Sequence, residues 1–269
     1  MISAQIKADL QNASWIRAMF EEGERLRSIH GADKVFDFSL GNPDYEPPAP
    51  VSETLRKLVV EETPGLHRYT SNAGYTDVRE KIAAGLAQES GLPLTAQHII
   101  MTCGAAGGLN VVLKTILNPG DEVILLAPYF VEYHFYVSNH GGKAVVVPTG
   151  DDFLPDPDLL AKNITPKTRA IIINSPNNPT GVVYSQQTLQ DMARVINAKE
   201  QEYGTEILAI SDEPYYKLVY EGAKVTNLMT VFKNAAIVNS FSKSLALPGE
   251  RIGYIAVSPN IEAVQLMID

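Results

Sequence analysis

Two short runs of the sequence consist almost only of apolar residues: AIIIN at residues 170–174 and ILAISD at residues 207–212. Neither run alternates between apolar and polar side chains, as a strand with one face in water does. Continuous apolar runs of this length, rich in β-branched residues, are typical of strands covered on both faces of a mostly parallel sheet. We therefore expect an α/β fold in which helices cover both faces of the sheet.

Five further runs of similar length have strand character, and helical patterns lie between most of the seven. In the clearest pattern, apolar residues recur at helical spacing from Leu109 to Leu117 and stop at Pro119-Gly120. This alternation predicts a three-layer α/β/α large domain with a seven-stranded, mainly parallel sheet. Two more helices are expected around residues 78–86 and 189–196, and the other expected strands are residues 98–102, 122–127, 144–148, 236–240 and 252–257.

The two ends of the chain follow different patterns. From Trp15 to Gly31 the sequence is typical of a charged helix, and a turn-rich segment follows it. We expect residues 1–45 to belong to a small domain and residues 46–269 to form the large domain. The last helical pattern reaches Asp269 without a C-terminal cap, so we expect the chain to be cut within a helix.

Composition and charge argue against several classes of function. The 269 residues include 22 Lys and Arg against 31 Asp and Glu, a net charge of −9 that repels nucleic-acid phosphates, so no nucleic-acid partner is expected. No window of the sequence approaches the uninterrupted apolar length of a membrane span, so none is expected. A single cysteine, Cys103, and the lack of a signal peptide favour a cytoplasmic protein. The five histidines show no metal-ligand spacing, so we expect no metal site.

Residues suited to one type of ligand follow the predicted strands. In open α/β sheets, ligands bind beyond the carboxyl ends of the strands. The small residues 104–108 lead from the first strand into a helix, whose N-terminus can hold an anion. Together, the segments at the strand exits could hold a phosphorylated aromatic aldehyde. The other exits carry Tyr129, Phe130 and Tyr133 after the second strand, Asn177 and Asn178 after the fourth, Asp212 after the fifth, and Lys243 with Arg251 after the sixth.

Each of these segments also has a purely structural explanation. A glycine-rich turn between strand and helix is more often required only for tight packing, and aromatic residues can cover a sheet edge. Asn and Pro are common turn residues, and a loop lysine is usually solvated. Asp212 differs, because a carboxylate at the end of so apolar a strand is partly desolvated and needs a cationic or hydrogen-bonding partner. The combination of segments, rather than any one of them, favours a ligand site.

Six motifs, in the same order along the chain, resemble those of the fold-type I pyridoxal-phosphate enzymes, and among them the class I/II aminotransferases. The resemblance runs from about Trp15 to the last residue. It implies pyridoxal 5′-phosphate as cofactor and the transfer of an amino group between an amino acid and a 2-oxo acid, in amino-acid metabolism and biosynthesis. The motifs are Gly41-Asn42-Pro43, Arg68-Tyr69-Thr70 with Asn72-Ala73-Gly74, Asn177-Asn178-Pro179-Thr180-Gly181, Asp212-Glu213-Pro214-Tyr215, Ser240-Phe241-Ser242-Lys243, and Pro248-Gly249-Glu250-Arg251-Ile252-Gly253-Tyr254.

The resemblance implies a role for each matching residue near the cofactor ring. Lys243 corresponds to the lysine that binds the cofactor as an aldimine and then moves the proton at the substrate α-carbon. Asp212 corresponds to the partner of the pyridine nitrogen, and Asn178 and Tyr215 to the residues that meet the ring 3′-oxygen. Phe130 corresponds to the aromatic residue that stacks on the ring. The implied catalytic residues are thus Lys243, Asp212 and Tyr215.

The resemblance also implies contacts to substrate, phosphate and a second subunit. Gly41 resembles the backbone position that meets the substrate carboxylate, and Asn178 is a second expected substrate contact. Tyr69 resembles a tyrosine that reaches the phosphate in the neighbouring subunit, which implies a homodimer with shared active sites. The expected phosphate ligands are the backbone of Gly104, Ala105 and Ala106, the hydroxyls of Ser240 and Ser242, and the guanidinium of Arg251.

Two departures from the family pattern bear on activity. The family usually has a Ser or Thr within residues 104–106, whereas this chain has Ala105 and Ala106, so one phosphate contact is lost. Family members are also longer, and the portion without a counterpart here completes the small domain and supplies the arginine that binds the substrate carboxylate. We therefore expect an incomplete small domain, and either a shortened form of a longer protein or a cofactor-binding core with impaired turnover.

Two other functions fit the same residues. A C–S or β-eliminating lyase would use the same lysine and the same aspartate, Asp212, on the same scaffold. A non-catalytic sensor domain that binds pyridoxal phosphate, of the kind fused to DNA-binding helices, is disfavoured because nothing basic or helix-turn-helix-like precedes Trp15.

Overall fold

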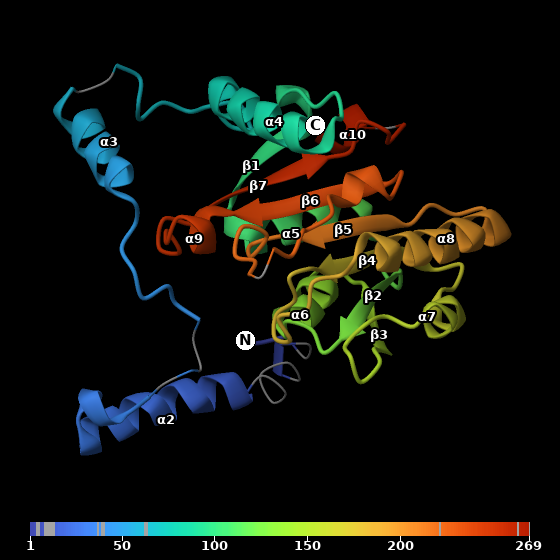
Figure 1. The fold of residues 1–269 in the computed structure, drawn as a ribbon, viewed down its shortest axis with the longest axis horizontal. Helices are drawn as coiled ribbons and strands as arrows, with labels where there is room; N and C mark the ends of the chain where they lie inside the picture. Colours follow the sequence, from blue (N-terminus) through green and yellow to red (C-terminus); the bar gives the residue numbers. More distant parts are fainter. Residues whose placement is uncertain are drawn as a thin grey trace. The chain divides into compact units, whose positions relative to one another are not determined.

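The computed structural model describes residues 1–3, 6–7, 14–36, 38, 41–61, 64–220, 222–262 and 264–268 (Figure 1). The chain divides into two compact units, Met1–Glu46 and Pro47–Asp269. The first unit contains helix α2 (Ser14–His30) and the short 3-10 helix η1 (Ala32–Lys34). The expected N-terminal helix is therefore confirmed, although the side chains of its apolar residues Trp15, Ile16 and Phe20 lie outside the described part of the chain.

The second unit is built on a seven-stranded sheet with the order β1-β7-β6-β5-β4-β2-β3. Strand β7 runs antiparallel to its neighbours β1 and β6, and the other strand pairs are parallel. The expected mainly parallel sheet is confirmed, and the strand bounds differ from the sequence expectation by one or two residues at most. The strands are β1 (Ile99–Cys103), β2 (Glu122–Ala127), β3 (Lys143–Pro148), β4 (Thr168–Asn174), β5 (Leu208–Asp212), β6 (Ala235–Ser240) and β7 (Ile252–Val257).

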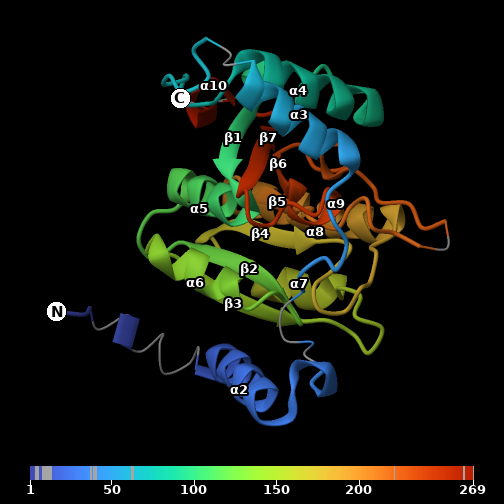
Figure 2. The ribbon, with the colours of Figure 1, turned by 90° about the vertical axis from the view of Figure 1, so that its left-hand side faces the viewer.

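The strands are apolar on both faces because each face packs against helices. Ile171 and Ile173 of β4 belong to one hydrophobic core, with residues of α4 (Thr76–Ser90), α7 (Pro157–Asn163) and α8 (Gln186–Tyr203). Ala170 and Ile172 of the same strand belong to a second core, with residues of α5 (Gly104–Ile116), α6 (Glu132–Asn139) and α10 (Val264–Ile268). Figure 2 shows α5 and α6 on one side of the sheet and α7 and α8 on the other. The expected three layers are therefore present.

Helix boundaries follow local signals in the sequence. Helix α8 begins after Ser185, whose hydroxyl accepts a hydrogen bond from the backbone N–H of Thr188, and it ends at Gly204 with a φ of 63°. Helix α4 likewise ends at Gly91, with a φ of 74°. Helix α3 (Ala49–Val60) follows two prolines and has no buried residue, which explains why no core-facing pattern indicates it.

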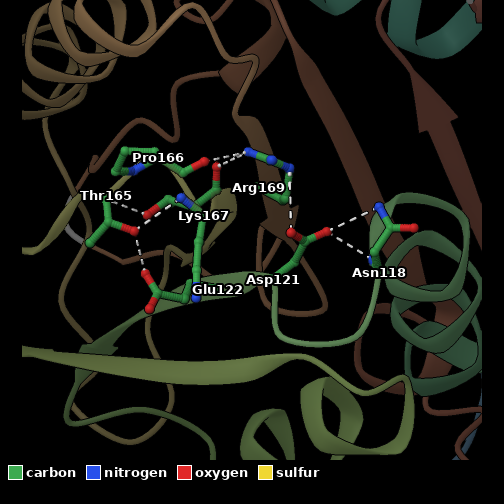
Figure 3. A network of polar contacts seen from close by, with 8 residues as sticks. Asn118, Asp121, Glu122, Thr165, Pro166, Lys167 and Arg169 are labelled. Carbon is green, nitrogen blue, oxygen red and sulfur yellow. Dashed lines mark hydrogen bonds and ion pairs between the residues drawn. The ribbon is translucent and has the colours of Figure 1, made fainter.

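The edge of the sheet at which β2 and β4 begin is closed by a polar network (Figure 3). Asp121 accepts a hydrogen bond of 2.8 Å from the backbone N–H of Asn118 and forms an ion pair of 3.6 Å with Arg169. Glu122 accepts a hydrogen bond of 2.6 Å from the Thr165 hydroxyl. Both buried carboxylates are thus satisfied, as is typical of a structural network.

Two expected absences can be compared with the described residues only. Across the described ranges, no helix has the length and apolar character needed to cross a membrane. The same ranges contain no group of three or more His, Cys, Asp or Glu arranged to hold a metal ion.

Candidate active site

One edge of the sheet collects the candidate residues of the second unit. Asn174 lies opposite Asp212 in the β4–β5 pair, so the ends of both strands meet at this edge. Ser240, the last residue of β6, lies opposite Gly253 of β7. Because β7 is antiparallel, its start rather than its end lies here, and Arg251 directly precedes it. Ligands of open α/β sheets bind at such an edge.

The turn between β1 and α5 forms a cradle beside Arg251. Gly104 has a φ of +72°, and a Cβ atom on it would lie only 2.8 Å from Nη2 of Arg251, so the guanidinium lies against the glycine. A Cβ on Gly108 would lie 2.7 Å from Val238, so α5 also packs tightly on the sheet. The side chain of Cys103, the residue before α5, makes no capping hydrogen bond. These small residues can therefore serve both tight packing and the binding of an anion. The N–H groups at the N-terminus of α5 and the guanidinium of Arg251 lie together, as an anion site requires.

Asp212 is a buried carboxylate with one unsatisfied oxygen. Its side chain lies on the face covered by α6, where Oδ2 accepts a hydrogen bond of 2.5 Å from the Tyr133 hydroxyl. Its backbone carbonyl accepts a hydrogen bond of 2.8 Å from Nδ2 of Asn174. Oδ1 is buried and has no hydrogen-bond partner among the described residues. Burial raises the pKa of Asp212 to about 6, although the Tyr133 hydrogen bond opposes the rise.

Two tyrosines of α6 complete the surroundings of Asp212. Tyr133 is buried, its ring meets that of Phe130 edge-on at 5.6 Å, and burial followed by the nearby Asp212 charge raises its pKa well above the ordinary value. Burial raises the pKa of Tyr136 to about 12, the charges of Glu132 and Asp212 add to the rise, and the charge of Arg251 opposes it. The sequence does not indicate the contact between Tyr133 and Asp212, and its one related signal is the spacing of Phe130, Tyr133 and Tyr136 at every third position.

Asn178 and Tyr215 lie next to each other across the site. The backbone N–H of Asn178 donates to Oδ1 of Asn174 at 2.6 Å, which fixes the turn after β4. Its Nδ2 donates to the Tyr215 hydroxyl at 3.4 Å. Burial raises the pKa of Tyr215 and the Asp212 charge adds to the rise, so the hydroxyl keeps its proton at neutral pH.

Lys243 follows the end of β6, the neighbour of β5. It lies in the short helix α9 (Phe241–Ser244), between the buried Ser242 and the half-buried Ser244. The lysine is half-buried, and burial lowers its pKa. A lowered pKa increases the fraction of neutral amine, which is the form that attacks carbonyl carbons and accepts protons.

Four of the expected residues are placed differently from these. The side chain of Tyr69 is fully exposed. Gly41 belongs to the first unit, so its expected substrate contact stays a prediction. Ala105 and Ala106 lie half-buried in the first turn of α5, where they bring no hydroxyl to the cradle.

The residues of this edge fit a phosphorylated, protonated aromatic ring. The cradle of glycine and arginine suits a phosphate, and the unsatisfied oxygen of Asp212 can accept a hydrogen bond from a ring nitrogen. A half-buried amine lies on the neighbouring strand exit. Pyridoxal phosphate carries a matching group for each of the three: a phosphate for the cradle, a pyridine nitrogen for Asp212 and an aldehyde for the amine.

Comparisons with known proteins agree with this geometry. A family model described as "Aminotransferase class I and II" matches residues 33–268. A probable aspartate/prephenate aminotransferase of Thermus aquaticus is 39% identical over 226 residues, which cover 83% of this chain and 56% of that protein. An aspartate aminotransferase of Pyrococcus horikoshii is 33% identical, over 92% of this chain and 60% of that one.

Solved structures give the same result for the fold. The crystal structure of an amino transferase from Eubacterium rectale superposes with a TM-score of 0.93 at 38% identity, and covers 100% of this chain and 68% of that one. An aspartate aminotransferase of Thermus thermophilus with maleate has a TM-score of 0.81 at 34% identity, over 94% of this chain and 63% of the other. The expected fold type I is confirmed, and the chain spans a little over half the length of the Thermus aquaticus relative. From the matching family model and these relatives, the chain belongs to the class I and II aminotransferases.

Proposed function

We propose that this chain binds pyridoxal phosphate and forms the cofactor-binding part of an enzyme that transfers amino groups between amino acids and 2-oxo acids. The observation that carries the proposal is Asp212, a buried carboxylate whose Oδ1 has no partner among the described residues and which shares its sheet edge with the Gly104–Arg251 cradle. When bound, the cofactor supplies an aldehyde that condenses with amines and a protonated ring that withdraws electrons from the substrate α-carbon.

The phosphate contacts of the proposal come from both sides of the β1–α5 turn. The N–H groups of Gly104, Ala105 and Ala106 and the guanidinium of Arg251 bind the phosphate, with the hydroxyls of Ser240 and Ser242 as further donors. Ser240 and Ser242 are 3% and 8% exposed, so both residues are shielded from bulk water.

The ring contacts assign one task to each side chain. Asp212 accepts the ring N–H through Oδ1, while Tyr133 holds Oδ2 and keeps the carboxylate in place. Tyr215 and Asn178, which already meet at 3.4 Å, donate to the ring 3′-oxygen. Phe130 packs on the ring face.

Lys243 is the group that binds the aldehyde and then takes and returns the proton at the substrate α-carbon. Its half-buried position supports this role, because the lowered pKa leaves more of the amine uncharged. Gly41 and Asn178 are the proposed contacts to the substrate. Since several relatives are named as aspartate aminotransferases, aspartate is the first amino acid to test.

A second copy of the chain is the proposed partner. Helix α3 has no buried residue, and Leu55, Val59 and Val60 on it are 53%, 76% and 80% exposed. Tyr69, nine residues after Val60, is also fully exposed. Such a segment is suited to contact a homodimer partner, with Tyr69 reaching the phosphate of the neighbouring site. Sedimentation of the cofactor-loaded chain tests this: a monomer at all concentrations would contradict the homodimer.

The cofactor proposal has a direct spectroscopic test. Added pyridoxal phosphate is expected to give a visible absorption band from the lysine-bound cofactor, and Lys243→Ala to abolish the band. A band of equal strength in Lys243→Ala would refute the assignment. Incubation with aspartate, alanine or cystathionine then separates the outcomes: formation of an oxo acid only with an amino acceptor supports transamination, and its formation without one supports the lyase. Cofactor binding with no product from any substrate would support a sensor. A cytoplasmic location stays a prediction that cell fractionation tests.

A further inference from the structure

A cavity of about 250 Å³ lies on the face of the sheet opposite Asp212, with a mostly apolar lining that includes Ile82, Leu86 and Phe241. Glu89 of α4, Tyr216 after β5, Asn239 of β6 and Tyr254 of β7 line it. Tyr254 belongs to the core that α4 covers, whereas Asp212 is bonded to Tyr133 in the other core. The chemistry proposed above uses none of these four residues, although Ser240, a proposed phosphate donor, also lines the cavity.

Tyr216 is tied to helix α4 by Glu89. The Tyr216 hydroxyl donates to both carboxylate oxygens of Glu89, at 2.6 and 2.7 Å. Hydrogen bonds to a charged acceptor are stronger than neutral ones. Burial raises the pKa of Tyr216 and the Glu89 hydrogen bond adds to the rise, so the hydroxyl remains a donor. The contact joins residues 127 positions apart in the sequence.

The neighbouring residue, Tyr215, has no comparably short contact to its hydroxyl among the residues that the structure describes. That hydroxyl meets Nδ2 of Asn178 at 3.4 Å, near the limit of a hydrogen bond. Its position therefore depends on the turn that follows β5. The backbone N–H of Leu218 donates to the Tyr215 carbonyl at 2.8 Å within this turn. The cavity beside Tyr216 reduces close packing on that side of the turn, and among the described residues the hydrogen bonds to Glu89 tie the turn to α4.

We propose that Tyr216 and Glu89 are positioning residues for Tyr215: by tying the turn to α4, they hold the Tyr215 hydroxyl where it can donate to the 3′-oxygen of the cofactor ring. The inference rests on the proposed function, because Tyr215 acts on the cofactor there. In this proposal α4 helps to tune the cofactor, although none of the site residues named above lies on α4.

The test compares variants that remove or keep the tie. Tyr216→Phe removes the hydroxyl and keeps the ring, Glu89→Ala removes the acceptor, and Glu89→Gln keeps an acceptor oxygen. Tyr220→Phe is the matched control, because Tyr220 is on the same loop and 80% exposed. Thermal melting first establishes that each variant is folded.

The first readout is the pH midpoint at which the absorption of the lysine-bound cofactor changes, because this midpoint depends on donors to the 3′-oxygen. Tyr216→Phe and Glu89→Ala are expected to shift the midpoint in the same direction as Tyr215→Phe, by about 0.3 unit or more, a twofold change in the titration constant. Glu89→Gln should retain most of the original midpoint, and the Tyr220→Phe control all of it. In a Tyr215→Phe background, Tyr216→Phe should add no further shift.

The second readout needs no cofactor. Backbone amides of residue 213 and of residues 215–218 are expected to exchange with solvent about fivefold faster or more in Tyr216→Phe and Glu89→Ala than in the unaltered chain, and at an unchanged rate in Tyr220→Phe. The inference would be overturned by unchanged amide exchange or by an unchanged absorption midpoint in Tyr216→Phe and Glu89→Ala. It would also be overturned if Tyr216→Phe shifted the midpoint as much in the Tyr215→Phe background as in the unaltered chain. If the unaltered chain forms no lysine-bound band, the proposed function fails first, and with it the role of Tyr215 that the tie would serve.

Discussion

Asp212→Asn is expected to stabilise the cofactor-free chain at neutral pH while it weakens cofactor binding. Burial raises the pKa of Asp212 from 3.8 to about 6. A difference of about 2 units corresponds to about 3 kcal/mol lost from the free energy of unfolding when the buried carboxylate is charged. Asparagine removes the charge but places an NH₂ group where Oδ1 has no partner, which costs about 1–2 kcal/mol. The expected net gain is therefore about 1–2 kcal/mol.

The gain depends on pH in a direction that follows from the raised pKa. Between about pH 3.8 and 6 the folded chain binds the Asp212 proton more readily than the unfolded chain, so its stability falls as the pH rises through this range. Asparagine does not titrate. Its advantage is therefore complete above pH 6 and disappears as the pH falls toward 3.8. Urea unfolding at about pH 7.5 and about pH 4.5 measures both limits.

Asp121→Asn provides a matched control at the other edge of the sheet. Asp121 is also buried, but the Asn118 N–H at 2.8 Å and Arg169 at 3.6 Å satisfy its charge. The same substitution is expected to lower stability there, because it weakens charge-assisted contacts. The reasoning would be refuted if Asp212→Asn lowered stability at pH 7.5, or if its gain were equal at both pH values.

Three further substitutions test the site residue by residue. Tyr133→Phe removes the hydrogen bond that lowers the pKa of Asp212, so the pKa of Asp212 should rise by about 1 unit. The pH below which cofactor affinity falls should rise with it, and the dissociation constant of the cofactor measured against pH tests this. Gly104→Ala should weaken the binding of pyridoxal phosphate by about tenfold or more and leave the binding of unphosphorylated pyridoxal unchanged. Gly120→Ala is its control, because Gly120 has a similar φ and open space around it, and this substitution should affect the binding of neither ligand. Ala105→Ser adds a hydroxyl to the first turn of α5 and should tighten phosphate-dependent binding about two- to tenfold; an unchanged affinity would mean that this side chain does not reach the phosphate.

The sheet and the strand exits could be predicted from the sequence because their signals are local. The three successive isoleucines of β4 face the two cores in turn and are all buried: Ile171, Ile172 and Ile173. The apolar run in the sequence therefore indicates that both faces of the sheet are covered. Strand direction follows from the helical crossovers, which bring Asn174 and Asp212 to one edge. The residue types at this edge then led to the prediction of a phosphorylated aromatic aldehyde as ligand.

Contacts between distant residues could not be predicted in the same way. Tyr133 and Asp212 are separated by 79 positions, and the rotation of α6 that brings them together depends on how its other residues pack. The sequence therefore identified Asp212 as a carboxylate that needs a partner without identifying Tyr133 as that partner. Helix α3 shows a different limit, because an exposed helix lacks the apolar periodicity from which helices are recognised.

The neighbours Asp212 and Glu213 explain why the site costs stability until a ligand is bound. Successive residues of a strand face opposite sides of the sheet. Burial raises the pKa of Glu213 to about 7, so near neutral pH it can remain protonated, and it accepts a hydrogen bond of 2.6 Å from the Ser211 hydroxyl. Asp212, with a pKa of about 6, is mostly ionised at that pH and has one oxygen without a donor. Apolar side chains at this position would give a more stable sheet, so the fold alone does not account for Asp212. A protonated ring nitrogen at Oδ1 both pairs the charge and satisfies the oxygen, and cofactor binding should therefore stabilise this edge of the sheet more than a ligand that occupied only the phosphate cradle.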